Sequence, residues 1–295
     1  MYMTPARFAT MGFGVDLTDV EDWEIRAKLV AASARVNTIT AAPRLPQPHD
    51  FRGGTATDEE HFWNTGDGRA VPPKRSFFTW HYPIKTCSAM RIYLTNNRYI
   101  DIGETERYLT QRTIEIVSLA MTASGIFGAA IVPEIGLLNP VVKMTYTYGY
   151  EIPWVAQVLE DTTGTGLTYR AQDQWWTSED DVNVYVDGVA TAPDSIDLEE
   201  GTVTFGSDQS GSLVTADYTS KLPREIAMAT GILAAEALGD RETRSRGMSG
   251  LRSVRVGEIA LEKDTPMRGG QTLVTPAQAE AEALLAGFRF FSAGA

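Results

Sequence analysis

The sequence predicts an α+β protein with a helical body and two small antiparallel β modules, the second of them inserted before the main C-terminal helix. Three observations lead to this fold class. Apolar residues recur at helical spacing over 19–38, 223–238 and 276–286. Alternating apolar and polar residues, broken by hairpin turns, fill 89–149 and 162–220. Prolines and glycines separate these segments and mark where one element gives way to the next.

These breaks divide the chain of 295 residues into five parts. They are an N-terminal helix and linker (1–50), a first β module (51–152), a second, inserted β module (153–221), the helical body with a return strand (222–262), and a C-terminal helix and tail (263–295). The two β modules share strand and turn patterns, which suggests a duplicated small β domain on a helical body. Chance similarity between two strand-rich stretches is the alternative.

The first helix is predicted at 19–38. Thr18 and Glu21 match a capping box, in which the hydroxyl and the carboxylate each accept a backbone N–H at the start of the helix. The predicted buried face consists of Ile25, Leu29, Ala32, Val36 and Ile39. Trp23 and Val30 lie on another face, so the helix is expected to make a second contact there.

Hairpin signals define both β modules. Asn96-Asn97 separates two apolar runs in the first module, and Asp187-Gly188 does so in the second. The strand 141–148 alternates strictly and predicts one buried face. Ile92-Tyr93-Leu94 and Val184-Tyr185-Val186 each precede a turn, which is the clearest likeness between the modules.

The helix at 223–238 organises the chain. Pro223 suits a first turn, where its missing N–H is not needed, and Gly239 is expected to end the helix. Ile226, Thr230, Leu233 and Ala237 recur at helical spacing among small residues. Two interpretations stay open: a core helix of one domain, or a helix that touches the next copy in a ring.

An Arg-rich turn and an apolar tail follow this helix. Arg241, Arg244, Arg246, Arg252 and Arg255 lie within one turn-rich segment, before and within a short strand predicted at 253–262. Arg presents a fork that suits carboxylates and phosphates, although salt bridges to nearby acidic residues are an alternative. Thr275 and Gln278 match a second capping box at the start of the last helix, 276–286. The residues expected to form an anchor at its end are Leu284, Leu285, Phe288, Arg289, Phe290 and Phe291. Packing of this tail onto the protein's own core is the alternative.

Composition limits the functional classes. The formal net charge of −12 argues against an electrostatic nucleic-acid binder, because phosphates require a basic face. Cys87 is the only cysteine, which excludes an internal disulfide and is typical of a reducing cytoplasm. No apolar run approaches the roughly 20 residues that a membrane span needs. The first residues do not resemble a secretory signal.

The sequence contains no recognised catalytic motif, so we do not expect this protein to be an enzyme. The sequence has no Gly-rich phosphate loop, no dinucleotide fingerprint and no nucleophile elbow, so no cofactor is expected. His49, His61 and His81 fall in one aromatic-rich region, but their spacing matches no zinc pattern and a structural role is expected instead. Trp175-Trp176 is a possible sugar-stacking pair, and acidic turns accompany it.

The order of these parts resembles the head-to-tail adaptor (connector, head-completion) proteins of tailed bacteriophages. The segments that carry the resemblance are "VVKMTYTYGYEIP", "LPREIAMATGILAAEALGD" and "GLRSVRVGEIALEKD". The "VNVYVDG" module is similar to small β domains added to phage virion proteins. The resemblance covers 17–40 and 85–262, and the second β module is more than a minimal adaptor carries.

The resemblance implies a structural virion protein at the neck, assembled in the cytoplasm of the host bacterium. Such adaptors form a ring, commonly of twelve subunits, beneath the portal protein. They extend the channel through which double-stranded DNA passes without sequence-specific binding, and they dock a stopper or tail-completion protein. Transferred to this chain, Ile226, Thr230, Leu233 and Ala237 would pack the ring. Arg244, Arg246, Arg252 and Arg255 would contact a partner or the channel, and the C-terminal anchor would bind the portal.

Two other functional classes fit the same sequence. A different virion component, such as a stopper, tail-completion or decoration protein, would use the same β modules without binding a portal. A carbohydrate-binding or hydrolytic protein would use Trp175, Trp176 and the acidic turns.

Overall fold

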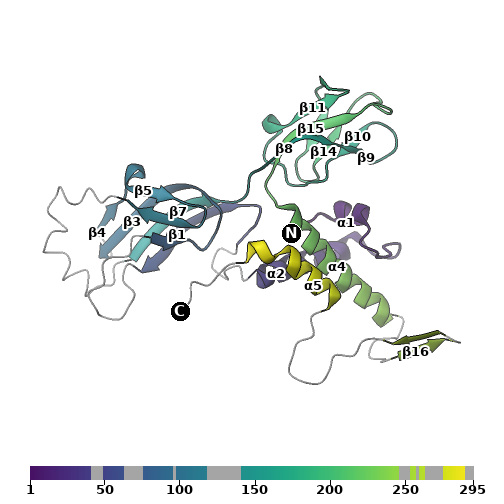
Figure 1. Cartoon of the computed structure of the whole chain (residues 1–295), viewed down its shortest axis with the longest axis horizontal. Coiled ribbons are helices and arrows are strands. Elements are labelled where there is room, and N and C mark those ends of the chain that lie inside the picture. The colour runs from purple at the N-terminus through teal and green to yellow at the C-terminus, as the bar shows by residue number, and fades with distance from the viewer. Residues whose placement is uncertain are drawn as a thin grey trace. The chain divides into compact units, whose positions relative to one another are not determined.

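The computed structural model describes residues 1–40, 49–62, 76–95, 98–117, 141–245, 253–256, 259–262 and 275–289 (Figure 1). The chain forms two compact units. One combines Met1–Ala42 with Glu151–Ala295, and the other is Pro43–Tyr150. The second β module therefore belongs with the helices, while the first β module is a unit of its own.

The predicted fold class is wrong, because the described residues are mostly β. They form four antiparallel sheets of three or four strands and one two-stranded hairpin, and the helices are a minority. Many strands are only two to four residues long. Strands this short show no clear alternation, so the long helical periodicities dominated the prediction.

The unit Pro43–Tyr150 contains the first β module. Its strands are β1 (Gly54–Phe62), β2 (Ser76–Phe78), β3 (Ile84–Thr95), β4 (Arg98–Asp101), β5 (Arg107–Leu109), β6 (Thr113–Ile116) and β7 (Val141–Tyr148), with a 3-10 turn, η1 (Glu104–Glu106). One sheet has the order β1-β7-β3-β4 and the other β2-β6-β5. β3 and β4 pair as a hairpin with Ile92 opposite Ile100, as predicted. The alternation predicted for 141–148 is confirmed, since Val142, Met144, Tyr146 and Tyr148 are all buried.

The second β module lies between this unit and the main helix in the sequence. Its strands are β8 (Ile152–Val158), β9 (Glu160–Asp161), β10 (Thr168–Arg170), β11 (Asn183–Val186), β12 (Val189–Ala190), β13 (Ser195–Asp197), β14 (Thr202–Thr204) and β15 (Val214–Ser220), with a 3-10 turn, η3 (Glu179–Asp181). Its sheets have the orders β12-β11-β15-β8 and β13-β14-β10-β9. The predicted Asp187-Gly188 turn is confirmed: both residues have positive φ, 50° and 80°, between paired β11 and β12.

The two modules have the same strand order. If β8, β10, β11, β12, β13, β14 and β15 are matched to β1 to β7 in turn, both pairs of sheets coincide, and β9 is one extra edge strand. Every pairing is antiparallel in both modules. The structure therefore favours the duplication hypothesis over chance similarity.

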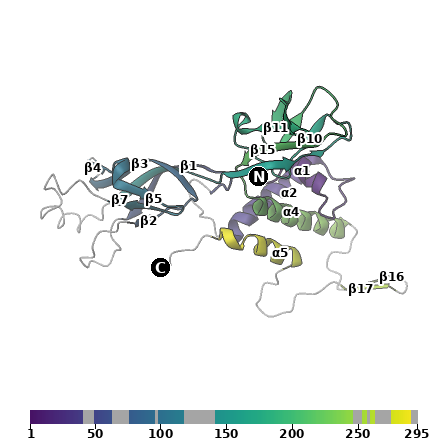
Figure 2. The ribbon, with the colours of Figure 1, turned by 45° about the horizontal axis from the view of Figure 1, so that its top comes forward.

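Outside the second β module, the described residues of this unit form four α-helices and one two-stranded hairpin. The helices are α1 (Pro5–Met11), α2 (Asp22–Ile39), α4 (Arg224–Ser245) and α5 (Pro276–Leu284), followed by a 3-10 turn, η4 (Ala286–Phe288). α4 is central, since it packs against both α2 and α5 (Figure 2). Phe13, which follows α1, lies so close to Gly231 that a Cβ there would come within 2.2 Å of its ring. The small residues of α4 thus allow close packing on several sides, as the sequence indicated.

The helix boundaries correct three details. The predicted capping box of Thr18 and Glu21 does not form. The Thr18 hydroxyl donates to the Asp16 carboxylate at 2.6 Å, and α2 begins later, with Glu21 as its N-cap and no side-chain hydrogen bond there. α4 continues past Gly239 to Ser245, because that glycine is helical and not left-handed. The single strand predicted at 253–262 is a hairpin of β16 (Ser253–Val256) and β17 (Ile259–Glu262). At α5, the Thr275 hydroxyl accepts from the Gln278 N–H at 3.1 Å, so the predicted cap is confirmed on that side.

Candidate functional site

The candidate site is the solvent-facing side of α2. Six residues share this side: Trp23, Ala27, Val30, Ala31, Ala34 and Thr38. All six are exposed, and at 3.6 residues per turn they fall within an arc of about 100°. Trp23 is 69% exposed and Val30 52% exposed. We call this set the α2 solvent face; it contains no charged residue.

The opposite side of α2 holds the helix in place. Ile25, Leu29 and Val36 are buried there, as predicted, and α2 packs on α4. Arg35 fixes the packing, because its guanidinium donates to Glu236 of α4 at 2.9 Å and to Gln278 of α5 at 2.6 Å. A helix that is apolar on two opposite sides is typical of one that is packed on both. The α2 solvent face therefore has the composition of a contact surface.

The residues expected to pack a ring are covered by the chain itself. Ile226 and Thr230 are fully buried and Leu233 is 2% exposed, while Ala237 is half-buried. The Thr230 hydroxyl donates to the Ile226 carbonyl at 2.8 Å, which satisfies it inside the helix. Packing within one subunit accounts for these residues, so a subunit contact is better sought on α2.

The expected C-terminal anchor is only partly described. Leu285 is fully buried, whereas Leu284 and Phe288 are half-buried. Arg289 is exposed and pairs with Glu282 at 3.3 Å. Phe290 and Phe291 lie outside the described residues. Leu285 thus serves the packing of α5, and Phe288 is the one aromatic residue of the predicted anchor that the structure describes.

The Arg-rich segment lies mostly outside the described residues. Arg244 falls in the last turns of α4 and Arg255 in β16, but their side chains are not described. Arg246 and Arg252 lie outside the described residues altogether. The hypothesis that this segment contacts a partner stays a prediction.

A buried carboxylate joins the second β module to α4. Asp173 is 3% exposed and accepts two hydrogen bonds from the Arg224 guanidinium, at 3.0 and 2.7 Å. It also accepts from the Tyr218 hydroxyl at 3.0 Å. Arg224 is placed over the ring of Trp154, 4.9 Å from its centroid. One carboxylate therefore ties the last strand of the module, β15, to the first turn of α4.

The N-terminal segment is bonded to the same module, which the sequence analysis missed. The Thr4 hydroxyl caps α1 and accepts from the Gln174 amide at 2.7 Å. The Trp175 indole donates to the Tyr2 carbonyl at 3.3 Å, and Arg7 donates to the Gln172 carbonyl. The sequence does contain a signal for α1 that could have revealed it: Thr4 followed by Pro5 is typical of an N-cap and a first-turn proline.

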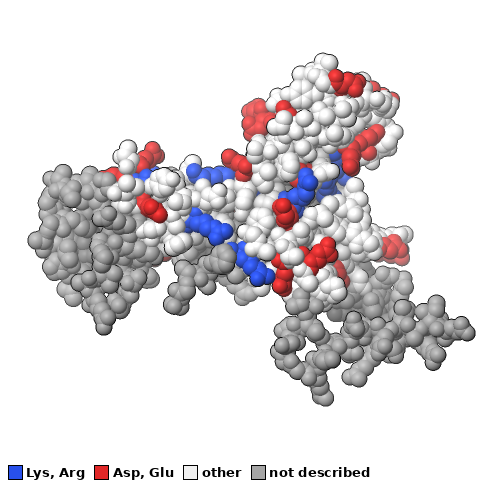
Figure 3. Space-filling view, in the orientation of Figure 1, with Lys and Arg blue, Asp and Glu red and all other residues white. Residues whose placement is uncertain are grey.

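The net negative charge of the chain is concentrated in the second β module. Residues 151–221 contain 14 Asp and Glu residues and two Lys and Arg residues, so their formal charge of −12 equals that of the whole protein. Figure 3 shows acidic side chains scattered over the face of this module that is in view. The rest of the chain is neutral overall, so any electrostatic effect on a partner comes chiefly from this module.

The histidines are arranged in two separate contacts within the unit Pro43–Tyr150. The Nδ1 atoms of His49 and His81 lie 3.1 Å apart, and His61 pairs with Glu59 at 2.6 Å. Among the described residues, no group of three or more His, Cys, Asp or Glu side chains is placed to hold a metal ion. Burial lowers the pKa of His49 to about 3, and the neighbouring His81 adds to this effect. Burial also lowers the pKa of His81, so His49 and His81 are neutral members of an aromatic and polar core.

The two adjacent tryptophans do not form a common stacking platform. Trp176 is 1% exposed and stacks on Tyr218, with ring centroids 4.5 Å apart. Trp175 is half-buried beside the N-terminal segment and has a positive φ of 60°. Both indoles make contacts within the protein, so the two rings do not form the exposed stacking pair that the sugar-binding alternative requires.

Comparison with known proteins does not assign the chain to a family. No protein-family model matches it, and no curated protein matches it in sequence. None of the helices in the described part of the chain is long and apolar enough to cross a membrane.

Proposed function

We propose that this chain is a head-to-tail adaptor of a tailed bacteriophage, a structural virion protein that forms a ring beneath the portal. The ring would extend the DNA channel and join the capsid to the tail or stopper. The observation that carries the proposal is the α2 solvent face, an exposed apolar arc on a helix already packed on its other side. Small residues along this arc would let a second subunit approach closely.

A closed ring needs two different surfaces on each subunit, because each copy must contact one neighbour on either side. The same compact unit has a second set of exposed apolar side chains, on the second β module. They are Val155, Val158, Val189 and Leu213, between 55% and 71% exposed. The α2 solvent face of one copy and this module of the next supply the two surfaces that the proposal requires.

The charge distribution is compatible with DNA passage. A surface that carries a formal charge of −12 offers no phosphate-neutralising contacts, so DNA would pass it without binding. In the proposed ring the second β module supplies this surface. The neutral remainder of the chain is left for contacts with portal and stopper.

Assembly of the purified protein tests the proposal. We expect rings or higher oligomers in mass photometry and negative-stain images, alone or with the portal protein. Val30→Asp should reduce assembly at least tenfold, because it places a carboxylate in the apolar contact. Arg26→Gln changes the charge by the same amount on an exposed residue outside the α2 solvent face, and should assemble normally.

Two results would contradict the proposal. A monomer that does not bind the portal at any concentration would favour another virion component. Equal assembly of Val30→Asp and Arg26→Gln would show that a ring, if present, uses a different surface.

Portal binding is tested separately at the C-terminus. Truncation after Gly287 removes Phe288 and the following residues but keeps the buried Leu285. The truncated protein should fold and assemble as the full chain does, and it should lose portal binding in a pull-down. Retained binding would remove the tail from the proposed anchor.

A further inference from the structure

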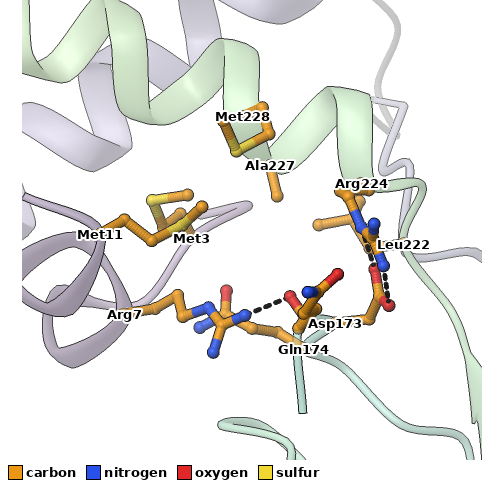
Figure 4. A pocket seen from close by; sticks show the side chains of 10 residues that line it. Met3, Arg7, Met11, Asp173, Gln174, Leu222, Arg224, Ala227 and Met228 are labelled. Atoms are coloured by element: carbon orange, nitrogen blue, oxygen red, sulfur yellow. Dashed lines mark hydrogen bonds and ion pairs between the residues drawn. The ribbon is translucent and has the colours of Figure 1, made fainter. Parts of the chain in front are cut away.

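A small hollow lies beneath the N-terminal helix, where α1, the loop after β10 and the start of α4 meet (Figure 4). About 20 Å³ of it is open to water-sized molecules, which is roughly room for one water. Its lining residues are Met3, Arg7, Met11, Gln172, Asp173, Gln174, Leu222, Arg224, Ala227 and Met228. One wall is therefore polar, and the other consists of methionines, Leu222 and Ala227.

Two buried polar side chains on this wall have spare hydrogen-bonding capacity. Arg7 is 7% exposed, and its guanidinium donates to the Gln172 carbonyl. Gln174 is 5% exposed, and its amide nitrogen donates to Thr4 at 2.7 Å. Among the described residues the Gln174 Oε1 atom has no hydrogen-bond donor. Figure 4 shows the Arg7 and Gln174 side chains on one side of the hollow, facing Ala227 and Met228.

The second arginine in the hollow is already neutralised, and Arg7 is not. Arg224 forms its two hydrogen bonds with Asp173, whereas no described carboxylate lies within 4 Å of Arg7. Burial and the nearby Arg170 lower the pKa of Arg7, which reflects the cost of keeping this cation out of water. Asp173, and to a lesser extent Glu160 and Glu200, raise the pKa of Arg7 only from beyond ion-pair distance, and Asp173 is already paired with Arg224.

We propose that this hollow binds the carboxylate of an acidic side chain from a partner protein. The carboxylate would accept two hydrogen bonds from the Arg7 fork, the geometry in which arginine binds carboxylates most strongly. A backbone N–H beside that carboxylate would donate to the Gln174 Oε1 atom. Met3, Met11 and Met228 are flexible and would shift to admit the methylene groups of the incoming side chain. The inference does not depend on the proposed ring.

The test uses two capped amino acids that differ only in the carboxylate. N-acetyl-aspartate methylamide should shift the methyl NMR signals of Met3, Met11 and Met228 in the full chain, and N-acetyl-asparagine methylamide should not. An absence of shifts at millimolar aspartate probe would overturn the proposal. Equal shifts with both probes would also overturn it, because they would show that the carboxylate is not recognised.

A variant gives an independent readout that needs no ligand. Gln174→Glu would supply the missing carboxylate from inside the hollow, so it should raise the melting temperature and abolish the response to the aspartate probe. Gln209→Glu adds the same charge to the same acidic module away from the hollow, and should lower or not change the melting temperature. A lower melting temperature for Gln174→Glu than for Gln209→Glu would overturn the proposal.

Discussion

In the first β module the last strand, β7, lies between β1 and β3, and in the second module β15 lies between β8 and β11. The registers make Tyr146 of β7 equivalent to Tyr218 of β15, since Tyr146 is opposite Ala56 and Tyr218 is opposite Trp154, each just before a bulge in the first strand. Both tyrosines are buried, and both donate to a buried carboxylate, Glu59 or Asp173.

The two carboxylates have different partners. Glu59 accepts from His61 and from the Trp80 N–H at 2.8 Å, so every described partner belongs to the first module. Asp173 accepts from Arg224 of α4, outside the second module. The comparison teaches that one strand order serves both a module that is closed on itself and one that is fixed to helices. The difference depends on whether the donors to the buried carboxylate come from the module itself or from α4.

Asp173→Ala should have the largest effect on this comparison. It leaves Arg224 and Tyr218 without their acceptor, and because Arg224 is partly exposed we expect a loss of about 3 kcal/mol, at the low end for a broken buried pair. Hydrogen exchange should speed up in both β15 and α4, while exchange in β7 should not change. The exposed Asp180→Ala, in the same module, should leave all three unchanged.

The second-largest effect concerns pH: lowering the pH should destabilise the first β module more than the second. His49 and His81 are neutral when folded because burial lowers the pKa of each, but in the unfolded chain they bind protons below about pH 6.5. The unfolded state then binds more protons, so stability falls as the pH falls. We expect His49 alone to cost the unit Pro43–Tyr150 about 2 kcal/mol between pH 6.5 and pH 5.

The second module contains no histidine, so β15 should keep its protection over this range. Hydrogen exchange of β7 and β15 at a series of pH values measures the contrast. His49→Gln should flatten the pH dependence in β7. Parallel loss of protection in both strands would show that a group other than the histidines governs the acid response.

Glu59→Gln should have a smaller effect than Asp173→Ala. The amide keeps one acceptor oxygen and faces the remaining donors with an NH₂ group, so we expect a loss of about 1–2 kcal/mol confined to the unit Pro43–Tyr150. Urea unfolding followed by hydrogen exchange in β1 and β7 measures it. The neighbouring Glu60→Gln breaks an exposed pair with Lys143 and should cost about 0.5 kcal/mol. Equal losses of unfolding free energy in the two variants would show that the buried hydrogen bonds of Glu59 stabilise the protein no more than an exposed ion pair does.

The smallest expected effect concerns the bulge that both first strands contain. Asp58 and Ala156 have positive φ, 53° and 51°, and their N–H groups bond the side chains of Thr145 and Asp217. Ala156→Gly should stabilise the protein by about 0.5–1 kcal/mol, because alanine is strained in this conformation. Asp58→Gly should gain less, since aspartate tolerates it better. Thermal unfolding of the two variants ranks them, and a reversed order would contradict the equivalence.

Much of the fold followed from strong local patterns. The alternation of 141–148, the Asp187-Gly188 turn and the apolar spacing of α2 were each predicted and are confirmed. The likeness between the modules was also visible in sequence, although the registers align Val184-Tyr185-Val186 with Met90-Arg91-Ile92, two residues earlier than the predicted match. A shift of two residues keeps the same face inward, which is why the pattern survived it.

The rest could not be predicted for identifiable reasons. Strands of two or three residues, such as β9, β12 and β14, carry too few positions for a period to be recognised. Asp173 meets Tyr218 and Arg224 only because the fold brings the loop after β10 to the junction of β15 and α4. The exposed side of α2 was indicated by Trp23 and Val30, but composition alone could not show that it stays open in the folded subunit.

The pairing of first and last strands has a further consequence. Gly54 lies opposite Tyr148 at the base of one module, and Ile152 lies opposite Ser220 at the base of the other. The chain thus enters and leaves each module at neighbouring points, so either module could be cut out and its ends rejoined by a short linker. Such an exchangeable cassette gives a lineage a simple way to gain or lose a whole docking surface without redesigning the helices that carry it.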